Sequence, residues 1–147
     1  MVGKWAVLFI KAFCAAIVFA ATLFTILTIA PAIETRFAPV VSKLRITKVM
    51  ADDVGNSIVY AEFTKLRDCE YIGLSWYHGD PRGEFERVPV VLLRKEGDTA
   101  SPNRPLGTQK AGPWIVSISP AELRGNSFAR LSHRCNFLWL TTTDFWP

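Results

Sequence analysis

The segment AFCAAIVFAATLFTILTIA, from Ala12 to Ala30, contains nineteen consecutive residues without a charge. As an α-helix rising 1.5 Å per residue, it would span about 28 Å, close to the ~30 Å hydrocarbon core of a bilayer. Trp5 and Lys11 precede or begin this stretch, where interfacial anchors are common. Pro31 lacks an amide donor and disfavours helix in the residue before it, so we expect the helix to end there. The sequence therefore predicts an N-terminal transmembrane anchor over residues 1–31.

A cleaved signal peptide is the alternative for this segment, because APA before and at Ala32 gives a small-x-small pattern. The apolar stretch is longer than the usual ~7–15 residues, and a proline beside the cleavage point is unfavourable. Both observations favour an uncleaved, single-pass anchor. Lys4 and Lys11 favour a cytoplasmic N-terminus, so the remaining chain is expected on the far side of the membrane.

The chain after the anchor has the pattern of a β domain. Residues 32–43 show no clear hydrophobic period, and we interpret them as a short stalk. Segments rich in β-branched and aromatic residues then alternate with turn signals. The predicted strands are 44–50, 57–65, 71–78, 87–93, 114–119, 127–134 and 137–143. This pattern predicts an all-β domain over 44–147, a seven-stranded antiparallel sandwich of immunoglobulin or fibronectin-III type.

The polar stretch 94–113 is long for an ordered loop, so it is either functional or contains a further short strand. The best candidate for such a strand is 106–109. Arginine and tryptophan are favoured at interfaces, and both occur in or beside this stretch. The candidate interaction residues are Arg104, Gln109, Lys110 and Trp114. The alternative for Trp114 is a place in the core.

Charge and motifs exclude several classes of function. The formal net charge is +4, and charges of both signs alternate after the anchor, as in DPRGEFER. This pattern is typical of a solvated surface and argues against nucleic-acid binding. The sequence lacks a G-x-S-x-G elbow, a glycine-rich phosphate loop and an H-E-x-x-H helix. We therefore predict no catalytic residues, no metal ligands and no cofactor.

Two cysteines are predicted to form a disulfide. Cys69 precedes the third predicted strand and Cys135 follows the sixth, and these strands are antiparallel neighbours in an immunoglobulin-type sheet. An exported compartment allows such a bond to persist. The side-chain alternation raises one conflict, because it places Ile72 and Leu74 on the inner face and Cys69 on the other. Cys135 has the parity of the inner-facing Leu131.

Metal and nucleophile chemistry are the alternatives for these cysteines. A zinc site would combine Cys69, His78, His133 and Cys135, but C-x8-H and H-x-C match no common structural pattern. A cysteine nucleophile paired with His78 or His133 would lack a glycine-rich oxyanion turn. We interpret His133 as a structural histidine. The anchor also carries a candidate helix-packing seam of small residues at Ala12, Ala16 and Ala20.

The motifs CEYIGLSWY, AGPW and HRCNFLWLTTTDF resemble small membrane-anchored proteins encoded by bacteriophages and prophages, over residues 63–146. The resemblance implies a bacterial inner membrane with the domain in the periplasm, and it attaches no activity. We therefore predict a non-enzymatic binding or interaction module of the cell envelope with a protein partner, related to lysis or superinfection if phage-encoded. The alternatives are a small envelope hydrolase or metal-dependent enzyme, and a structural subunit that oligomerises through its helix.

Overall fold

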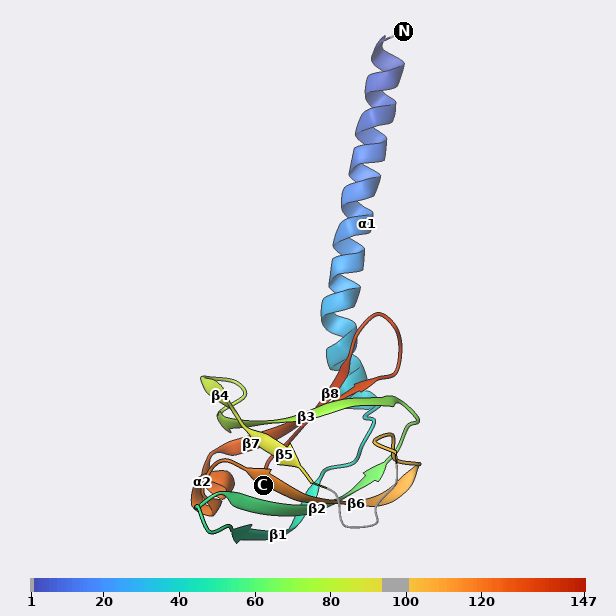
Figure 1. The fold of residues 1–147 in the computed structure, drawn as a ribbon. Coiled ribbons are helices and arrows are strands. Elements are labelled where there is room, and N and C mark those ends of the chain that lie inside the picture. Colours follow the sequence, from blue (N-terminus) through green and yellow to red (C-terminus); the bar gives the residue numbers. More distant parts are fainter. Residues whose placement is uncertain (1, 94–100) are drawn as a thin grey trace.

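A computed structural model describes residues 2–93 and 101–147. One long helix, α1 (Val2–Phe37), stands on a β domain (Figure 1). The strands are β1 (Arg45–Ala51), β2 (Ser57–Lys65), β3 (Glu70–Gly79), β4 (Phe85–Val88), β5 (Val90–Leu92), β6 (Gly107–Val116), β7 (Ser127–Arg134) and β8 (Thr141–Phe145). A short helix, α2 (Pro120–Gly125), connects β6 to β7.

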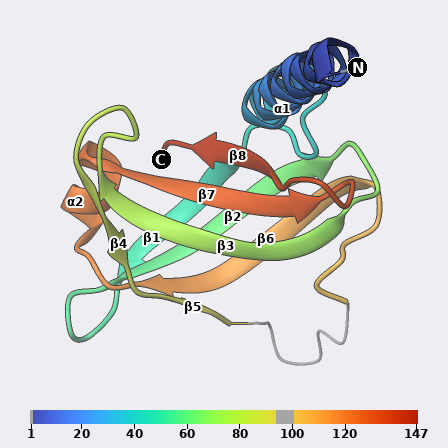
Figure 2. The ribbon, with the colours of Figure 1, turned by 90° about the horizontal axis from the view of Figure 1, so that it is seen from above.

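The strands form two four-stranded antiparallel sheets, in the orders β1-β2-β6-β5 and β4-β3-β7-β8. Seen along α1, the sheet of β3 and β7 lies over the sheet of β2 and β6, and the strands run across the helix axis (Figure 2). The predicted all-β sandwich behind a long apolar helix is therefore confirmed. The count of seven strands is wrong for the described residues, which form eight.

Pro89 explains the additional strand. The predicted strand 87–93 divides at this residue into β4, which pairs with β3, and β5, which pairs with β6. Proline has no amide hydrogen to donate to a ladder, so a continuous paired strand is disfavoured there. Its carbonyl still accepts a 3.0 Å hydrogen bond from the Ser117 amide. The chain changes sheets at this point.

The candidate strand 106–109 and the predicted strand 114–119 belong to one strand, β6. The register between β2 and β6 shifts between Val59 and Ala61, opposite Gly112. Gly112 has φ +98°, and a Cβ there would lie 2.4 Å from the Val59 carbonyl oxygen, so glycine is required. Residues 94–100 of the long polar stretch lie outside the described residues.

The segment after the apolar part of α1 differs from the predicted stalk. α1 continues through Pro31 to Phe37, so the expected helix end at Pro31 is wrong. Proline is tolerated in such helices where the surroundings compensate for the missing hydrogen bond. Val40 and Val41 are buried in the core, and the Val40 carbonyl accepts from the Leu66 amide at 2.8 Å. The helix therefore passes into the domain through a tight connection.

Trp76 on β3 lies at the centre of the core and is fully buried. Its indole Nε1 donates to the Ser127 Oγ at 3.0 Å, and its ring packs edge-on against Trp114. α2 begins with a capping box, in which the side chains of Ser119 and Glu122 bind each other's backbone amides. Leu123 of α2 is fully buried, which places this helix against the core.

Candidate functional site

The Cys69–Cys135 disulfide joins the segment before β3 to the segment after β7, with the Cα atoms 4.7 Å apart. This confirms the predicted pairing. A β-bulge removes the conflict over which face Cys69 occupies, because Tyr71 pairs with His133 while the next pair is Gly73 with Ser132. The unpaired residue, Ile72, is 40 % exposed, so its expected inner position is wrong. The extra residue places Tyr71 and Cys69 on the inner face.

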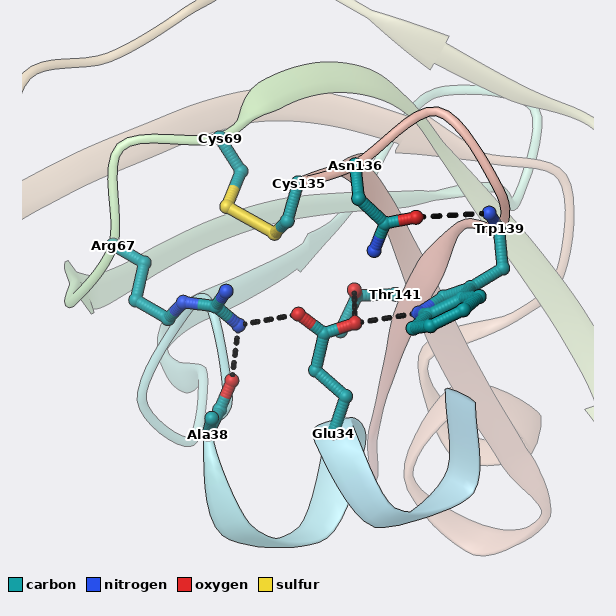
Figure 3. Close-up of polar contacts among 8 residues, drawn as sticks. All are labelled: Glu34, Ala38, Arg67, Cys69, Cys135, Asn136, Trp139 and Thr141. Carbon is teal, nitrogen blue, oxygen red and sulfur yellow. Dashed lines mark hydrogen bonds and ion pairs between the residues drawn. A yellow bond between two sulfur atoms is a disulfide. The ribbon is translucent and has the colours of Figure 1, made fainter. Parts of the chain in front are cut away.

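A polar network beside this disulfide joins α1 to the domain (Figure 3). Glu34 Oε1 accepts a 2.8 Å hydrogen bond from Arg67 Nη1. Its Oε2 accepts from Trp139 Nε1 at 2.7 Å and from Thr141 Oγ1 at 2.8 Å. Arg67 Nη1 also donates to the Ala38 carbonyl at 2.8 Å. One carboxylate of α1 therefore binds two segments of the domain that are far apart in the sequence, at Arg67 and at 139–141.

The loop before β8 positions Trp139 for this contact. The Asn136 Oδ1 accepts hydrogen bonds from the amides of Leu138 and Trp139, which turns the chain back toward α1. The disulfide fixes Cys135 at the other end of the turn. Sequence reasoning missed this network, although a lone Glu34 directly after an apolar helix was an available signal.

The same loop exposes apolar side chains beside α1. Phe137 is 91 % exposed, and Leu138 and Leu140 are also exposed. The loop projects from the sandwich along the last turns of the helix (Figure 1). Residues 137–143 were predicted as a strand, but β8 begins only at Thr141, because the turn at Asn136 takes the preceding residues out of the sheet.

A cavity of about 280 Å³ lies between the two sheets. Its apolar lining includes Phe63, Tyr71, Leu74, Trp114 and Leu131. Lys65 from β2 and His133 from β7 also line it, and each is only 3 % exposed. Burial, together with the nearby positive charge of Lys65, lowers the pKa of His133 from 6.5 to about 4. The imidazole of His133 in this cavity is therefore uncharged at neutral pH.

The four candidate interaction residues do not form one surface. Trp114 is 8 % exposed and belongs to the core. Gln109 pairs with Phe63 and Lys110 with Glu62, so their side chains lie on opposite faces of the sheet. Arg104 lines the inter-sheet cavity. Whether any of them contacts a partner stays a prediction.

The alternative zinc site is not assembled in this structure. Cys69 and Cys135 are bonded to each other. His78 pairs with Ser127 while Tyr71 pairs with His133, so the two histidines lie roughly 20 Å apart along the sheet. In residues 2–93 and 101–147, no three His, Cys, Asp or Glu side chains are grouped to hold a metal ion. The helix-packing seam at Ala12, Ala16 and Ala20 is exposed on α1 and stays a prediction.

Comparisons with models of protein families, with curated proteins and with solved structures found no significant match to this chain. Within the described residues, α1 is the one helix long and apolar enough to cross a membrane, from Gly3 to Phe37.

Proposed function

We propose that the protein is a non-enzymatic binding module that is anchored by α1 in the bacterial inner membrane and presents its sandwich to the periplasm at a fixed angle. The observation that carries the proposal is the network around Glu34. A flexible tether would suffice for an anchor that only keeps a domain near the membrane. A tether that is hydrogen-bonded to three side chains from two segments of the domain favours a role in which orientation matters.

The junction between α1 and the domain consists of the Glu34 carboxylate and its partners Arg67, Trp139 and Thr141, and it is held by charged hydrogen bonds. Hydrogen bonds to a carboxylate are shorter and stronger than those between neutral groups. The Glu34 side chain is 14 % exposed and the Arg67 side chain 36 % exposed, so water screens this pair less than a surface ion pair. A short connection with Val40 and Val41 in the core leaves little chain for independent motion of the domain.

The apolar loop around Phe137 supports a membrane-facing orientation. Phe137 and Leu138 are exposed at the end of the domain where α1 emerges, and Trp139 beside them bonds to the helix. Exposed apolar side chains next to a transmembrane helix suit the bilayer interface, where aromatic residues are enriched. We infer that this loop rests on the outer surface of the membrane.

The immunoglobulin-like assignment belongs to the same proposal. Immunoglobulin constant-type domains have strands A, B, E and D in one sheet and C, F and G in the other. The orders β1-β2-β6-β5 and β3-β7-β8 correspond to these sets, with β4 added beside β3. Buried Trp76 on β3 matches the tryptophan of strand C, whereas the disulfide joins C to F. Such scaffolds present binding loops on a rigid framework.

The side of the membrane on which the domain lies and its angle relative to α1 can be tested separately. We expect a C-terminal alkaline phosphatase fusion to be active in bacteria and a C-terminal green fluorescent protein fusion to be dark. The reverse result would contradict the periplasmic assignment.

For orientation, spin labels on Cys14 and on Glu86→Cys in the full chain in nanodiscs should give a narrow distance distribution. Glu34→Ala should broaden it, because the domain loses its hydrogen bonds to the helix. Glu62→Ala is the matched control, since Glu62 pairs with Arg45 at 2.8 Å away from the junction. An equal width in all three proteins would refute a fixed angle set by Glu34.

A further inference from the structure

We propose that the inter-sheet cavity binds a small organic acid, with the acid group held by Lys65 and His133 and the apolar body packed among the aromatic side chains. This inference rests on the proposed binding function and names the chemical class of its ligand. Its site lies inside the sandwich and differs from the membrane-facing loop and from the junction at Glu34.

The size and lining of the cavity suit a small, mostly apolar molecule. Its volume of about 280 Å³ is near the lower end of known ligand pockets, roughly 300–1,000 Å³. Phe63 and Trp114 come from one sheet, and Tyr71 and Leu131 from the other. A flat ring or a short alkyl chain would contact both sheets at once.

Lys65 gives the cavity a charge that is costly to bury. It follows the inward-facing residues Ala61 and Phe63 at alternate positions of β2, so its side chain enters the interior. Within the part of the chain that the structure describes, Lys65 Nζ pairs with the Asp68 Oδ1 at 3.6 Å, on a side chain that is 89 % exposed. Among the described residues, no acceptor lies within hydrogen-bond distance of Lys65 Nζ. A buried ammonium in this state favours an acidic ligand.

His133 provides the second polar contact from the opposite sheet. Its Nδ1 is buried and, within residues 2–93 and 101–147, has no hydrogen-bond partner. A neutral imidazole can donate one hydrogen bond to a carboxylate that Lys65 also binds. The ring packs edge-on against Tyr71, with centroids 5.9 Å apart, which fixes its orientation. The two sheets therefore contribute one polar side chain each to the lining of the same cavity.

The signs of the lining charges decide between an acid and a base as ligand. Lys65 and Arg104 are the charged side chains among the described residues that line the cavity, and no carboxylate does. An amine would add a second positive charge beside Lys65, whereas an acid would bring a negative charge to it. The Asn103 Oδ1 accepts from the Tyr71 amide, and this bond holds the segment before Arg104 against the cavity.

Calorimetric titration of the full chain in nanodiscs tests the proposal with three six-carbon probes, hexanoate, hexan-1-ol and hexylamine. We expect hexanoate to bind at least tenfold more tightly than either of the others. Phenylacetate is the aromatic counterpart, and its affinity relative to hexanoate distinguishes an aromatic acid from a lipid-derived one. Equal binding of acid, alcohol and amine would overturn the proposal.

Lys65→Met keeps the apolar stem and removes the charge, and we expect it to weaken hexanoate at least tenfold. Lys110→Met on the outer face of β6 is the matched control and should bind as the original chain does. In the original chain, saturation with hexanoate should also raise the pKa of His133, measured by NMR from the imidazole nitrogens. An unchanged pKa together with an unaffected Lys65→Met variant would refute the site. Neither result depends on the spin-label distances, so the fixed-angle proposal fails or stands separately.

Discussion

Glu34 and Lys65 are charged residues whose side chains are partly and fully buried, respectively, and they differ in how many hydrogen bonds they make. Glu34 accepts three hydrogen bonds from side chains of the domain. Lys65 is more deeply buried, at 3 % exposure, and among the described residues it has a single ion-pair neighbour at 3.6 Å. A charge whose hydrogen bonds are complete holds a structure together, whereas one without them is kept at a cost. The comparison separates the junction at Glu34 from the proposed ligand site at Lys65.

The disulfide lies close to both charges, and its removal should have the largest effect. Cys69→Ala with Cys135→Ala opens a loop with a sequence separation of 66. The chain-entropy estimate gives a loss of about 4 kcal/mol in the free energy of unfolding. Urea titration of tryptophan fluorescence on the full chain in nanodiscs would measure it. Cys14→Ala is the control, because this cysteine is free and exposed on α1. A loss below about 1 kcal/mol would contradict the estimate.

The buried imidazole beside Lys65 should make the domain sensitive to acid. The folded pKa of His133 is about 4, below the value of 6.5 for a free histidine, so the unfolded chain takes up the proton first as the pH falls. The stabilisation is therefore complete above pH 6.5 and is lost as the pH falls toward 4. By linkage the loss is about 3 kcal/mol at most.

Unfolding titrations at pH 7, 5.5 and 4 would measure this loss, and His133→Gln separates it from the carboxylates that titrate in the same window. The difference in unfolding free energy between the two chains should shrink as the pH falls. Parallel pH profiles for the original chain and for His133→Gln would show that His133 is not the group responsible.

Removing the charge of Glu34 should destabilise the junction. Glu34→Gln keeps the size of the side chain but weakens the bonds from Arg67, Trp139 and Thr141, at an expected cost of about 2 kcal/mol. Glu62→Gln should cost less than about 1 kcal/mol, because its partner Arg45 is 77 % exposed. Urea titrations of the two variants would compare them directly. Equal costs would remove the distinction between junction and surface pair.

Removing the charge of Lys65 should raise the free energy of unfolding, whereas removing that of Glu34 lowers it. This effect should be the smallest of those predicted. Lys65→Met replaces a buried charge by an apolar side chain of similar volume, which is often neutral or stabilising. We expect the free energy of unfolding in the absence of ligand to rise by about 1 kcal/mol. A loss of more than 1 kcal/mol would show that the ion pair with Asp68 stabilises the fold and would weaken the contrast with Glu34.

The apolar helix and the disulfide could be predicted from the sequence, because they depend on local patterns and on strand order. The apolar segment 12–30 predicted the helix, and strand order placed Cys69 beside Cys135. Counting alternate positions gave the wrong face for Ile72. One extra residue in a β-bulge exchanges the inner and outer faces for all residues of the strand that precede it in the sequence. Pro89 was hidden inside a run of β-branched residues that is typical of a single strand.

The two candidate sites were harder to predict for a different reason. The partners of Glu34 lie 33, 105 and 107 residues away in the sequence, so no spacing rule connects them. Lys65 ends a strand at an inward position, where a lysine would ordinarily be expected to reach solvent. His133 was singled out for its rarity and interpreted as structural, and only its position opposite Lys65 relates it to a ligand.

The tight passage from α1 through Val40 and Val41 has a mechanical consequence. Because the connection between them is short, the helix and the sandwich are expected to turn as one body. A rotation of the helix about its own axis, imposed by a neighbouring helix, would sweep the far edge of the sandwich through an arc. Torque applied to the helix would then become displacement of the sandwich, with the Glu34 carboxylate as the coupling.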